Sequence, residues 1–144
     1  MSLQAEVLLE GVAAHAQALA LTAPISFWGG VDPKTGRIAD PRHPEYGEET
    51  SGRVLLVPAT VGSSSAAAIL LELVHAGRAP AALVLHEPDA ILLLGLIVAK
   101  EMGMPVPIAL RLDRGHFQSL GGRDLEITAD GEIIFRQPGT KSIR

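Results

Sequence analysis

Three consecutive serines stand where a strand is expected to pass into a helix, and this arrangement can bind an anion. Residues 53–58 have the β-branched and leucine character of a buried strand, and Gly62-Ser63-Ser64-Ser65 leads into the strong helix formers of residues 66–76. The first turn of a helix exposes unpaired backbone N–H groups and the positive end of the helix dipole. Together with serine hydroxyls, these groups can hold a carboxylate or a phosphate. The structural alternative is that the serines only cap the helix.

A second group of residues surrounds the chain's only tryptophan. Within residues 24–33, Phe27 and Trp28 stand beside Gly29-Gly30, and Asp32 follows shortly after. Aromatic side chains make up only 3% of the chain, so two of them next to a loop-forming glycine pair predict a shaped binding surface. The alternative is that both rings close the end of a small core.

Residues 24–52 are rich in turn formers and predict a long ordered loop, which in compact domains is commonly functional. Its polar residues are candidates for acid–base chemistry or substrate contact. They are Asp32, Lys34, Arg37, Asp40, Arg42, His43 and Glu45. A scattered aspartate or a lone histidine is also a common turn former or surface group, so both roles stay open. The five histidines are too widely spaced to predict a zinc site, and no metal site is expected in this chain.

Several common catalytic signatures are missing from the sequence. Neither Gly-x-x-x-x-Gly-Lys nor Gly-x-Gly-x-x-Gly occurs, which removes the usual basis for predicting a nucleotide site. Gly-x-Ser-x-Gly, the nucleophile turn of many hydrolases, is also missing. The chain has no cysteine, so it can supply neither a thiol nucleophile nor thiolate ligands for an iron–sulfur cluster.

The elements that must position these residues alternate along the chain. Strand, helix, strand, helix and strand are predicted in turn at residues 53–58, 66–76, 81–85, 89–102 and 106–110. Asp89 is the expected N-cap of the second helix. This βαβ order favours a parallel core sheet.

The two ends of the chain add further strands. We expect two strands within residues 3–20, broken near Gly11, with a helix as the competing interpretation of the alanine-rich half. Residues 124–128 and 132–136 alternate in character and flank Asp130-Gly131, which predicts a hairpin. The fold class is therefore α/β with an added antiparallel hairpin.

Composition sets the broad class of the protein. With 144 residues, 47% of them hydrophobic, the chain has the size of one compact domain, expected to span residues 1–144. Its net charge of −4, with Lys and Arg scattered, argues against nucleic acid as a partner. The richest apolar run, residues 90–99, is too short to span a membrane, and no secretory signal is visible. A cytoplasmic protein is the expectation.

Four strings of residues carry a family resemblance. They are Ser26-Phe27-Trp28-Gly29-Gly30-Val31-Asp32-Pro33-x-Thr35-Gly36, Asp40-x-x-His43-Pro44-x-x-Gly47, Gly62-Ser63-Ser64 and Ala79-Pro80-Ala81-Ala82. Together they resemble the small subunit, or swivel domain, of the aconitase X family, over about residues 11–108. The Gly-Ser-Ser turn is also similar to the swivel domains of ordinary aconitases and isopropylmalate isomerases, where a serine at that turn is the catalytic base.

The resemblance implies a fold, a reaction and a division of labour. The fold is an aconitase-type swivelling β/β/α domain, with parallel core strands, flanking helices and a C-terminal hairpin. Such a domain closes over a separate large subunit whose cysteines carry an iron–sulfur cluster, so no cofactor is expected on this chain. Family members dehydrate hydroxy acids, cis-3-hydroxy-L-proline in bacteria and 5-phosphomevalonate in archaea. A cluster iron binds the leaving hydroxyl as a Lewis acid while a base removes the neighbouring proton.

By the same resemblance, Ser63 is the expected catalytic base. The residues expected to bind substrate are Gly62, Ser64, Ser65, Trp28, Gly29, Gly30, Asp32 and His43. Two positions depart from the family pattern: Val61 stands where a basic residue, often arginine, is usual, and Ala66-Ala67 replaces a Gly-Ser pair. The missing positive charge disfavours a phosphorylated substrate, so cis-3-hydroxy-L-proline or a similar hydroxy acid is preferred.

The resulting expectation is an iron–sulfur hydro-lyase small subunit that is inactive alone and forms a heterodimer with a large aconitase-like subunit. Three alternatives stay open. The chain could be a phosphomevalonate dehydratase small subunit, or a non-catalytic anion-binding or regulatory module, which Val61 would favour. An isopropylmalate isomerase small subunit shares the Gly-Ser-Ser turn but does not account for the tryptophan loop.

Overall fold

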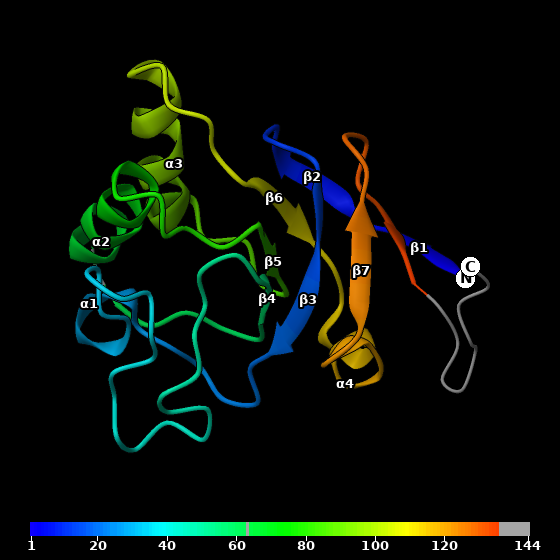
Figure 1. Cartoon of the computed structure of the whole chain (residues 1–144), viewed down its shortest axis with the longest axis horizontal. Coiled ribbons are helices and arrows are strands. Elements are labelled where there is room, and N and C mark those ends of the chain that lie inside the picture. The colour runs from blue at the N-terminus through cyan, green and yellow to red at the C-terminus, as the bar shows by residue number, and fades with distance from the viewer. Residues whose placement is uncertain (63, 136–144) are drawn as a thin grey trace.

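A single mixed sheet organises the computed structural model, which describes residues 1–62 and 64–135 (Figure 1). Its strands are β1 Ser2–Gln4, β2 Glu6–Leu9, β3 Ala14–Ala20, β4 Val54–Val57, β5 Ala82–Leu85, β6 Ile108–Arg111, β7 Asp124–Ile127 and β8 Glu132–Ile134. Across the sheet their order is β1-β8-β7-β3-β4-β5-β6-β2. The four strands β3 to β6 run parallel, and the pairings on either side of them are antiparallel.

The sheet curls round until its two edges meet. β1 and β2 stand at opposite ends of the strand order, yet only Ala5 separates them in the chain. The Ala5 backbone N–H donates to Gly131 O at 2.9 Å, between the pairing of β1 with β8 and that of β2 with β6. The N-terminal segment therefore closes the sheet into a barrel-like layer and covers both of its edges.

The alternation of side chains along the strands divides the core in two. In β4, Val54 and Leu56 belong to the cluster inside the curled sheet, whereas Leu55 and Val57 belong to the cluster under the helices. β5 and β6 follow the same alternation, so the parallel strands are buried on both faces.

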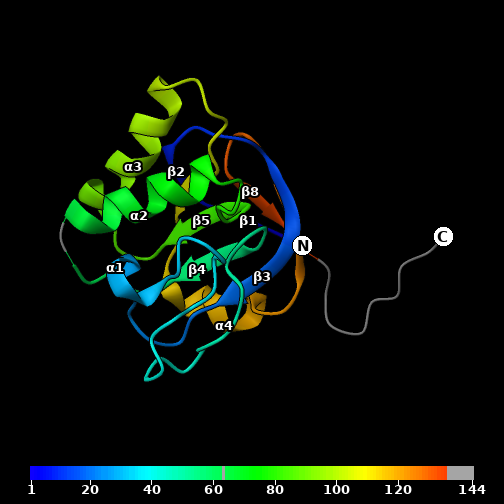
Figure 2. The ribbon, with the colours of Figure 1, turned by 60° about the vertical axis from the view of Figure 1, so that its left-hand side comes forward.

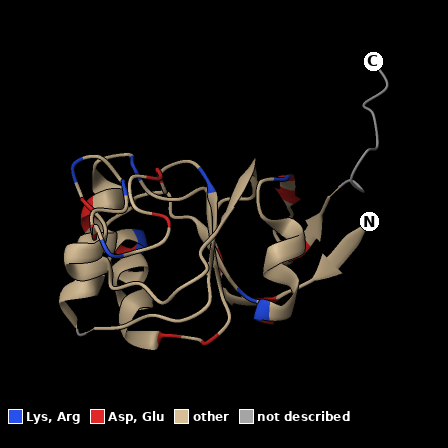
Figure 3. Ribbon diagram, turned by 90° about the horizontal axis from the view of Figure 1, so that it is seen from below, with Lys and Arg blue, Asp and Glu red and all other residues tan. Residues whose placement is uncertain are grey.

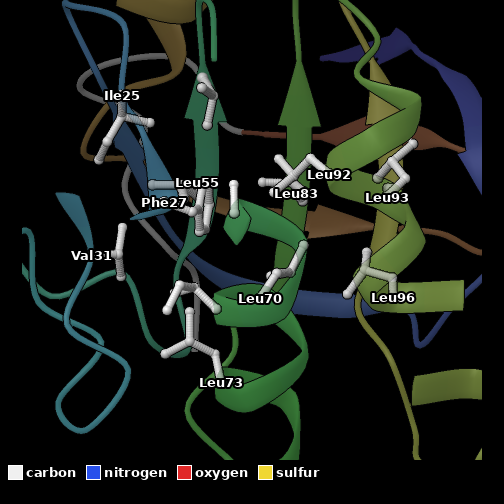
Figure 4. Packing of buried hydrophobic residues seen from close by; sticks show 14 of the residues in the cluster. Ile25, Phe27, Val31, Leu55, Leu70, Leu73, Leu83, Leu92, Leu93 and Leu96 are labelled. Carbon is white, nitrogen blue, oxygen red and sulfur yellow. The ribbon is translucent and has the colours of Figure 1, made fainter. Parts of the chain in front are cut away.

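Two long helices cover the outer face of the parallel strands. These are α2 Ser64–His75 and α3 Ala90–Glu101, which lie side by side (Figure 2). Figure 4 shows leucines of both helices above the sheet. Those labelled are Leu70 and Leu73 from α2, Leu92, Leu93 and Leu96 from α3, and Leu55 and Leu83 from the strands. A short turn, η1 Arg114–His116, and helix α4 Phe117–Leu120 lie apart from this pair and close the inner cluster with Phe117 and Leu120.

The predicted order of central strands and helices is confirmed, and the differences lie outside this central run. The break near Gly11 is present, but a second break at Ala5 makes three strands of residues 3–20. The helix considered for the alanine-rich half is wrong, because that half is β3, which pairs with β4 and β7. The hairpin is present, although Arg136 lies outside the described residues. The short helical elements η1 and α4, and the helical turn at Phe27–Gly30 within the predicted loop, were not predicted.

Candidate functional site

The tryptophan loop runs beside the segment that connects β4 to α2. Residues 24–52 contain one irregular helical turn, α1 Phe27–Gly30, and otherwise form turns and isolated bridges. The Ile25 backbone N–H donates to Ala59 O at 3.1 Å, and the Val61 N–H donates to Ile25 O at 3.0 Å. These two bonds hold the start of the loop against the approach to the serine-rich helix.

Gly62 lets the loop and the helix start come into contact. Its φ of +130° favours glycine, and a Cβ on it would lie 3.0 Å from Ser26 Oγ. The Ser26 hydroxyl in turn donates to Trp28 O at 3.0 Å. A side chain at position 62 would therefore press on the residue that shapes the tryptophan turn.

A cavity of about 380 Å³ opens beside this contact. It is lined by Pro24, Ile25, Ser26, Trp28, Gly29, Gly30, Ala39, Asp40, Pro41, Arg42 and His43. Trp28 is 62% exposed at the cavity, whereas Phe27 is 1% exposed and belongs to the helix-side core. The two predicted roles of the aromatic pair are thus divided between the rings: Phe27 closes the core, and Trp28 forms a surface.

Two charged side chains stand among the described residues that line the cavity. Asp40 Oδ1 accepts from the Arg42 backbone N–H at 2.9 Å and lies 3.3 Å from Arg42 Nε. The backbone hydrogen bond and then the guanidinium lower the pKa of the Asp40 carboxyl below its usual value. The cavity rim therefore presents a carboxylate and a guanidinium side by side.

His43 braces the loop from inside. Its side chain is buried, and its Nδ1 accepts from the Glu45 backbone N–H at 3.1 Å. An Nδ1 that accepts carries no proton, so Nε2 holds the ring proton and donates to Ala23 O at 3.2 Å. Because both ring nitrogens have partners within the loop, His43 contributes a wall to the cavity, and direct substrate binding by it stays a prediction.

Asp32 shapes the turn that follows the tryptophan. Its Oδ1 accepts from the Lys34 N–H at 2.8 Å, and its backbone oxygen accepts from the Gly36 N–H at 2.7 Å. Asp32 does not belong to the described cavity lining. The structure gives it a turn-forming role, and substrate contact by Asp32 stays a prediction.

The serine cluster is described in part, because Ser63 lies outside the described residues. Ser64 and Ser65 are exposed in the first turn of α2, directly after Gly62. That turn contains no acidic residue, so no side-chain carboxylate within it opposes an anion. Ala66 and Ala67, which depart from the family pattern, are buried against the core and α3, where alanine suits the packing.

Charged and imidazole side chains lie together at the carboxyl ends of β5 and β6. This group was not predicted from the sequence. His86 Nδ1 accepts from the Arg114 backbone N–H at 3.0 Å and lies 3.4 Å from Asp113 Oδ1. Arg111 Nε donates to His86 O at 3.0 Å. The sequence did predict that these strands run parallel. Because the carboxyl ends of parallel strands lie at one edge of a sheet, residues that follow the two strands could have been expected to lie close together.

Within residues 1–62 and 64–135, no three His, Cys, Asp or Glu side chains are grouped so that they could hold a metal ion. Among the same residues, no helix is both long enough and apolar enough to cross a membrane.

Known proteins with similar sequences are dehydratases. The cis-3-hydroxy-L-proline dehydratase of Pseudomonas aeruginosa is 45% identical over 125 residues, which cover 85% of this chain and 21% of that protein. This chain thus spans about a fifth of that relative's length. The phosphomevalonate dehydratase small subunit of Methanopyrus kandleri is 34% identical over 127 residues, covering 88% of this chain and 84% of that subunit.

The fold has a close counterpart among solved structures. Thermococcus kodakaraensis aconitase X in its holo-form superposes with a TM-score of 0.80 over 95% of this chain and 99% of that one, at 24% identity. The family model described as the aconitase X swivel domain matches residues 2–135. Because that match spans nearly the whole described chain, with the mixed α/β fold expected of it, this protein belongs to the aconitase X swivel-domain family.

Proposed function

We propose that this chain is the small subunit of an iron–sulfur hydro-lyase that dehydrates cis-3-hydroxy-L-proline. The observation that carries this proposal is the contact between the two halves of the site. Ser26 lines the cavity and also lies against Gly62, which precedes the serines of α2. Gly62, Ser64 and Ser65 are not part of the cavity lining, and the proposal places the ligand between the cavity and this helix start. An anion-binding helix start and an aromatic wall on one surface suit a small organic acid.

The chain's own residues would bind the acid and move one proton. The backbone N–H groups and the hydroxyls of Ser64 and Ser65 would hold a carboxylate at the start of α2. Ser63, between Gly62 and Ser64 in the sequence, would remove the proton beside that carboxylate. Serine is a weak base in water, so the positive end of the helix dipole and exclusion of water would have to stabilise its alkoxide.

The proposal places the cluster and the remaining walls of the site on a larger partner. This chain has no cysteine to ligate iron, and its cavity lies at the surface beside an exposed Trp28. Relatives either carry the domain as 21% of a longer chain or are named small subunits. When bound on the partner, the cluster supplies a Lewis acid for the leaving hydroxyl. The chain alone would therefore be inactive.

Charge at the cavity favours the imino acid over a phosphorylated substrate. Cis-3-hydroxy-L-proline carries an ammonium next to the carboxylate that the start of α2 would hold, and the Asp40 carboxylate at the cavity suits this ammonium. Val61, exposed beside the helix start, adds no positive charge for a phosphate. Phosphomevalonate is the second candidate, because this chain matches 84% and 87% of the length of two archaeal small subunits of that name.

The test is the dehydration of both substrates by this chain assembled with the large subunit from the same source. We expect turnover of cis-3-hydroxy-L-proline, and a loss in kcat of at least about 100-fold for Ser63→Ala with unchanged assembly. Ser119→Ala, which removes an exposed hydroxyl on α4, is the matched control and should retain full activity.

Other outcomes separate the alternatives. Turnover of phosphomevalonate alone would select the second candidate. Near-normal activity of Ser63→Ala would exclude this serine as the base. An assembled complex that dehydrates neither substrate would favour the non-catalytic module.

A further inference from the structure

The outer side of α3 carries a stripe of exposed apolar residues. Ile91, Leu94, Val98 and Met102 are each between 43% and 61% exposed. Their spacing of three and four residues places them on one side of the helix, whereas Leu92, Leu93, Leu96 and Ala99 are buried on the other. A helix that is apolar on both sides is expected where a second surface covers it.

The stripe extends onto α2 and reaches the proposed site. The helices touch where a Cβ on Gly95 would lie 2.3 Å from Ala67 O, and the next residue of α2, Ala68, is exposed. At the helix starts, the Thr60 hydroxyl donates to Asp89 Oδ2 at 2.6 Å, which ties the segment carrying Val61 to α3. The apolar helix face, as it is called below, consists of Val61, Ala68, Ile91, Leu94, Val98 and Met102.

Few charged side chains lie on the two helices that carry this face. Within their described bounds, α2 and α3 contain three Asp, Glu, Lys or Arg residues, and their ribbons are mostly tan in Figure 3. Lys100 Nζ donates to Glu10 O at 3.1 Å, which turns it toward the N-terminal strands. Glu72 follows Ala68 by four residues and Glu101 follows Val98 by three, so both exposed carboxylates border the face toward the C-terminal ends of the two helices.

We propose that the apolar helix face is where the large subunit docks, an inference that rests on the proposed function. The face begins at the edge of the site that the partner has to cover, since Val61 precedes Gly62 directly. In the Pseudomonas aeruginosa relative, 21% of the protein corresponds to this chain, so the domain there belongs to a much larger protein that offers a surface to cover the face. A stable interface takes about 800 Å² from each partner, and half-exposed large apolar residues supply the apolar centre of such an area.

A second copy of this chain is the competing occupant. Copies paired through this face would cover the surface beside the start of α2 and compete with the partner for it. The net charge of −4 on every copy also opposes self-association, although the face itself is uncharged.

Two variants introduce charge at the centre of the face without threatening the fold. Leu94→Glu and Val98→Lys replace exposed residues of α3 by good helix formers. Gln118→Glu is the matched control, because it adds the same carboxylate at an exposed position of α4, which packs on the other core. Each chain is titrated by calorimetry with the purified large subunit from the same source. We expect Leu94→Glu and Val98→Lys to weaken binding by at least about tenfold and the control to stay within about twofold.

Activity separates this inference from the proposed function. Because the variants leave the site residues intact, excess large subunit should restore the wild-type kcat. Tight binding and full activity of both variants would overturn the docking inference alone. Sedimentation of the wild-type chain as a dimer that these variants convert to monomer would also overturn it, in favour of the second copy. Failure of the wild-type chain to bind the large subunit would overturn both the inference and the proposed function.

Discussion

At the level of single residues, the Asp89 side chain connects the start of α3 to the segment that leads into α2. Its Oδ1 accepts from the Leu92 backbone N–H at 3.0 Å and caps α3, while its Oδ2 accepts from the Thr60 hydroxyl at 2.6 Å. Thr60 belongs to the segment that leads through Val61 to α2. One carboxylate therefore begins one helix and fixes the approach to the other.

We expect Asp89→Ala to lower the free energy of unfolding by about 1–2 kcal/mol, because it removes an N-cap and leaves the Thr60 hydroxyl without its acceptor. Urea unfolding measures the change. Glu87→Ala removes an exposed acid two residues earlier and should change stability by less than about 0.5 kcal/mol. Equal losses in the two variants would show that net charge near α3, and not the cap, is responsible.

The sequence identified Phe27 and Trp28 as a notable pair, but it could not predict which ring is buried and which is exposed. Phe27 and Trp28 are adjacent, and their different burial depends on where the turn α1 meets the helix-side core. The same holds for Asp32 and His43, whose partners within the loop follow from turns that local sequence suggests only in outline. Asp89 was predictable because an N-cap is a local signal.

At the level of elements, the site depends on how closely α2 and α3 pack. Gly95 faces the backbone of α2, and a Cβ on it would lie 2.3 Å from Ala67 O. This approach positions the starts of both helices at one edge of the sheet, where Thr60 and Asp89 connect them.

Substitution of Gly95 by alanine tests this packing through the sign of its effect. Helix propensity alone predicts that Gly95→Ala stabilises the protein by about 1 kcal/mol. We expect the opposite, a loss of about 1–3 kcal/mol in the free energy of unfolding, because the added methyl forces the helices apart. Leu94→Ala, at the exposed neighbouring position, should lower it by less than about 1 kcal/mol. A gain in stability for Gly95→Ala would contradict the close contact.

The central strands and helices could be predicted because each carries its own pattern of apolar runs and caps. The break at Ala5 and the segment formed by η1 and α4 could not. The first depends on a change of pairing partner from β8 to β6, and the second is a short segment held by Phe117 and Leu120 in the inner cluster. Both are set by tertiary contacts that leave no periodicity in the sequence.

At the level of the whole molecule, the parallel half of the sheet carries the site, and the antiparallel half closes the structure. Loops after β3 and β4 form the cavity and the helix start, whereas β7, β8 and the N-terminal strands complete the curled sheet. Because the N-terminal strands already cover the described edges of the sheet, the helix layer remains as the surface through which we propose that the partner binds.

Because Ala5 links β1 to β2, we expect its backbone N–H to stabilise both edges of the sheet. Ala5→Pro removes the donor to Gly131 O at a buried position, and we expect it to lower the free energy of unfolding by at least about 2 kcal/mol. Hydrogen exchange should then accelerate in both β6 and β8, because β2 and β1 loosen together. Ala5→Gly keeps the N–H and is the matched control, with a loss of about 1 kcal/mol and protection retained in both strands. Faster exchange confined to β8 would mean that the two edges are held independently, so that the N-terminal segment acts as two separate strands and not as one closing element.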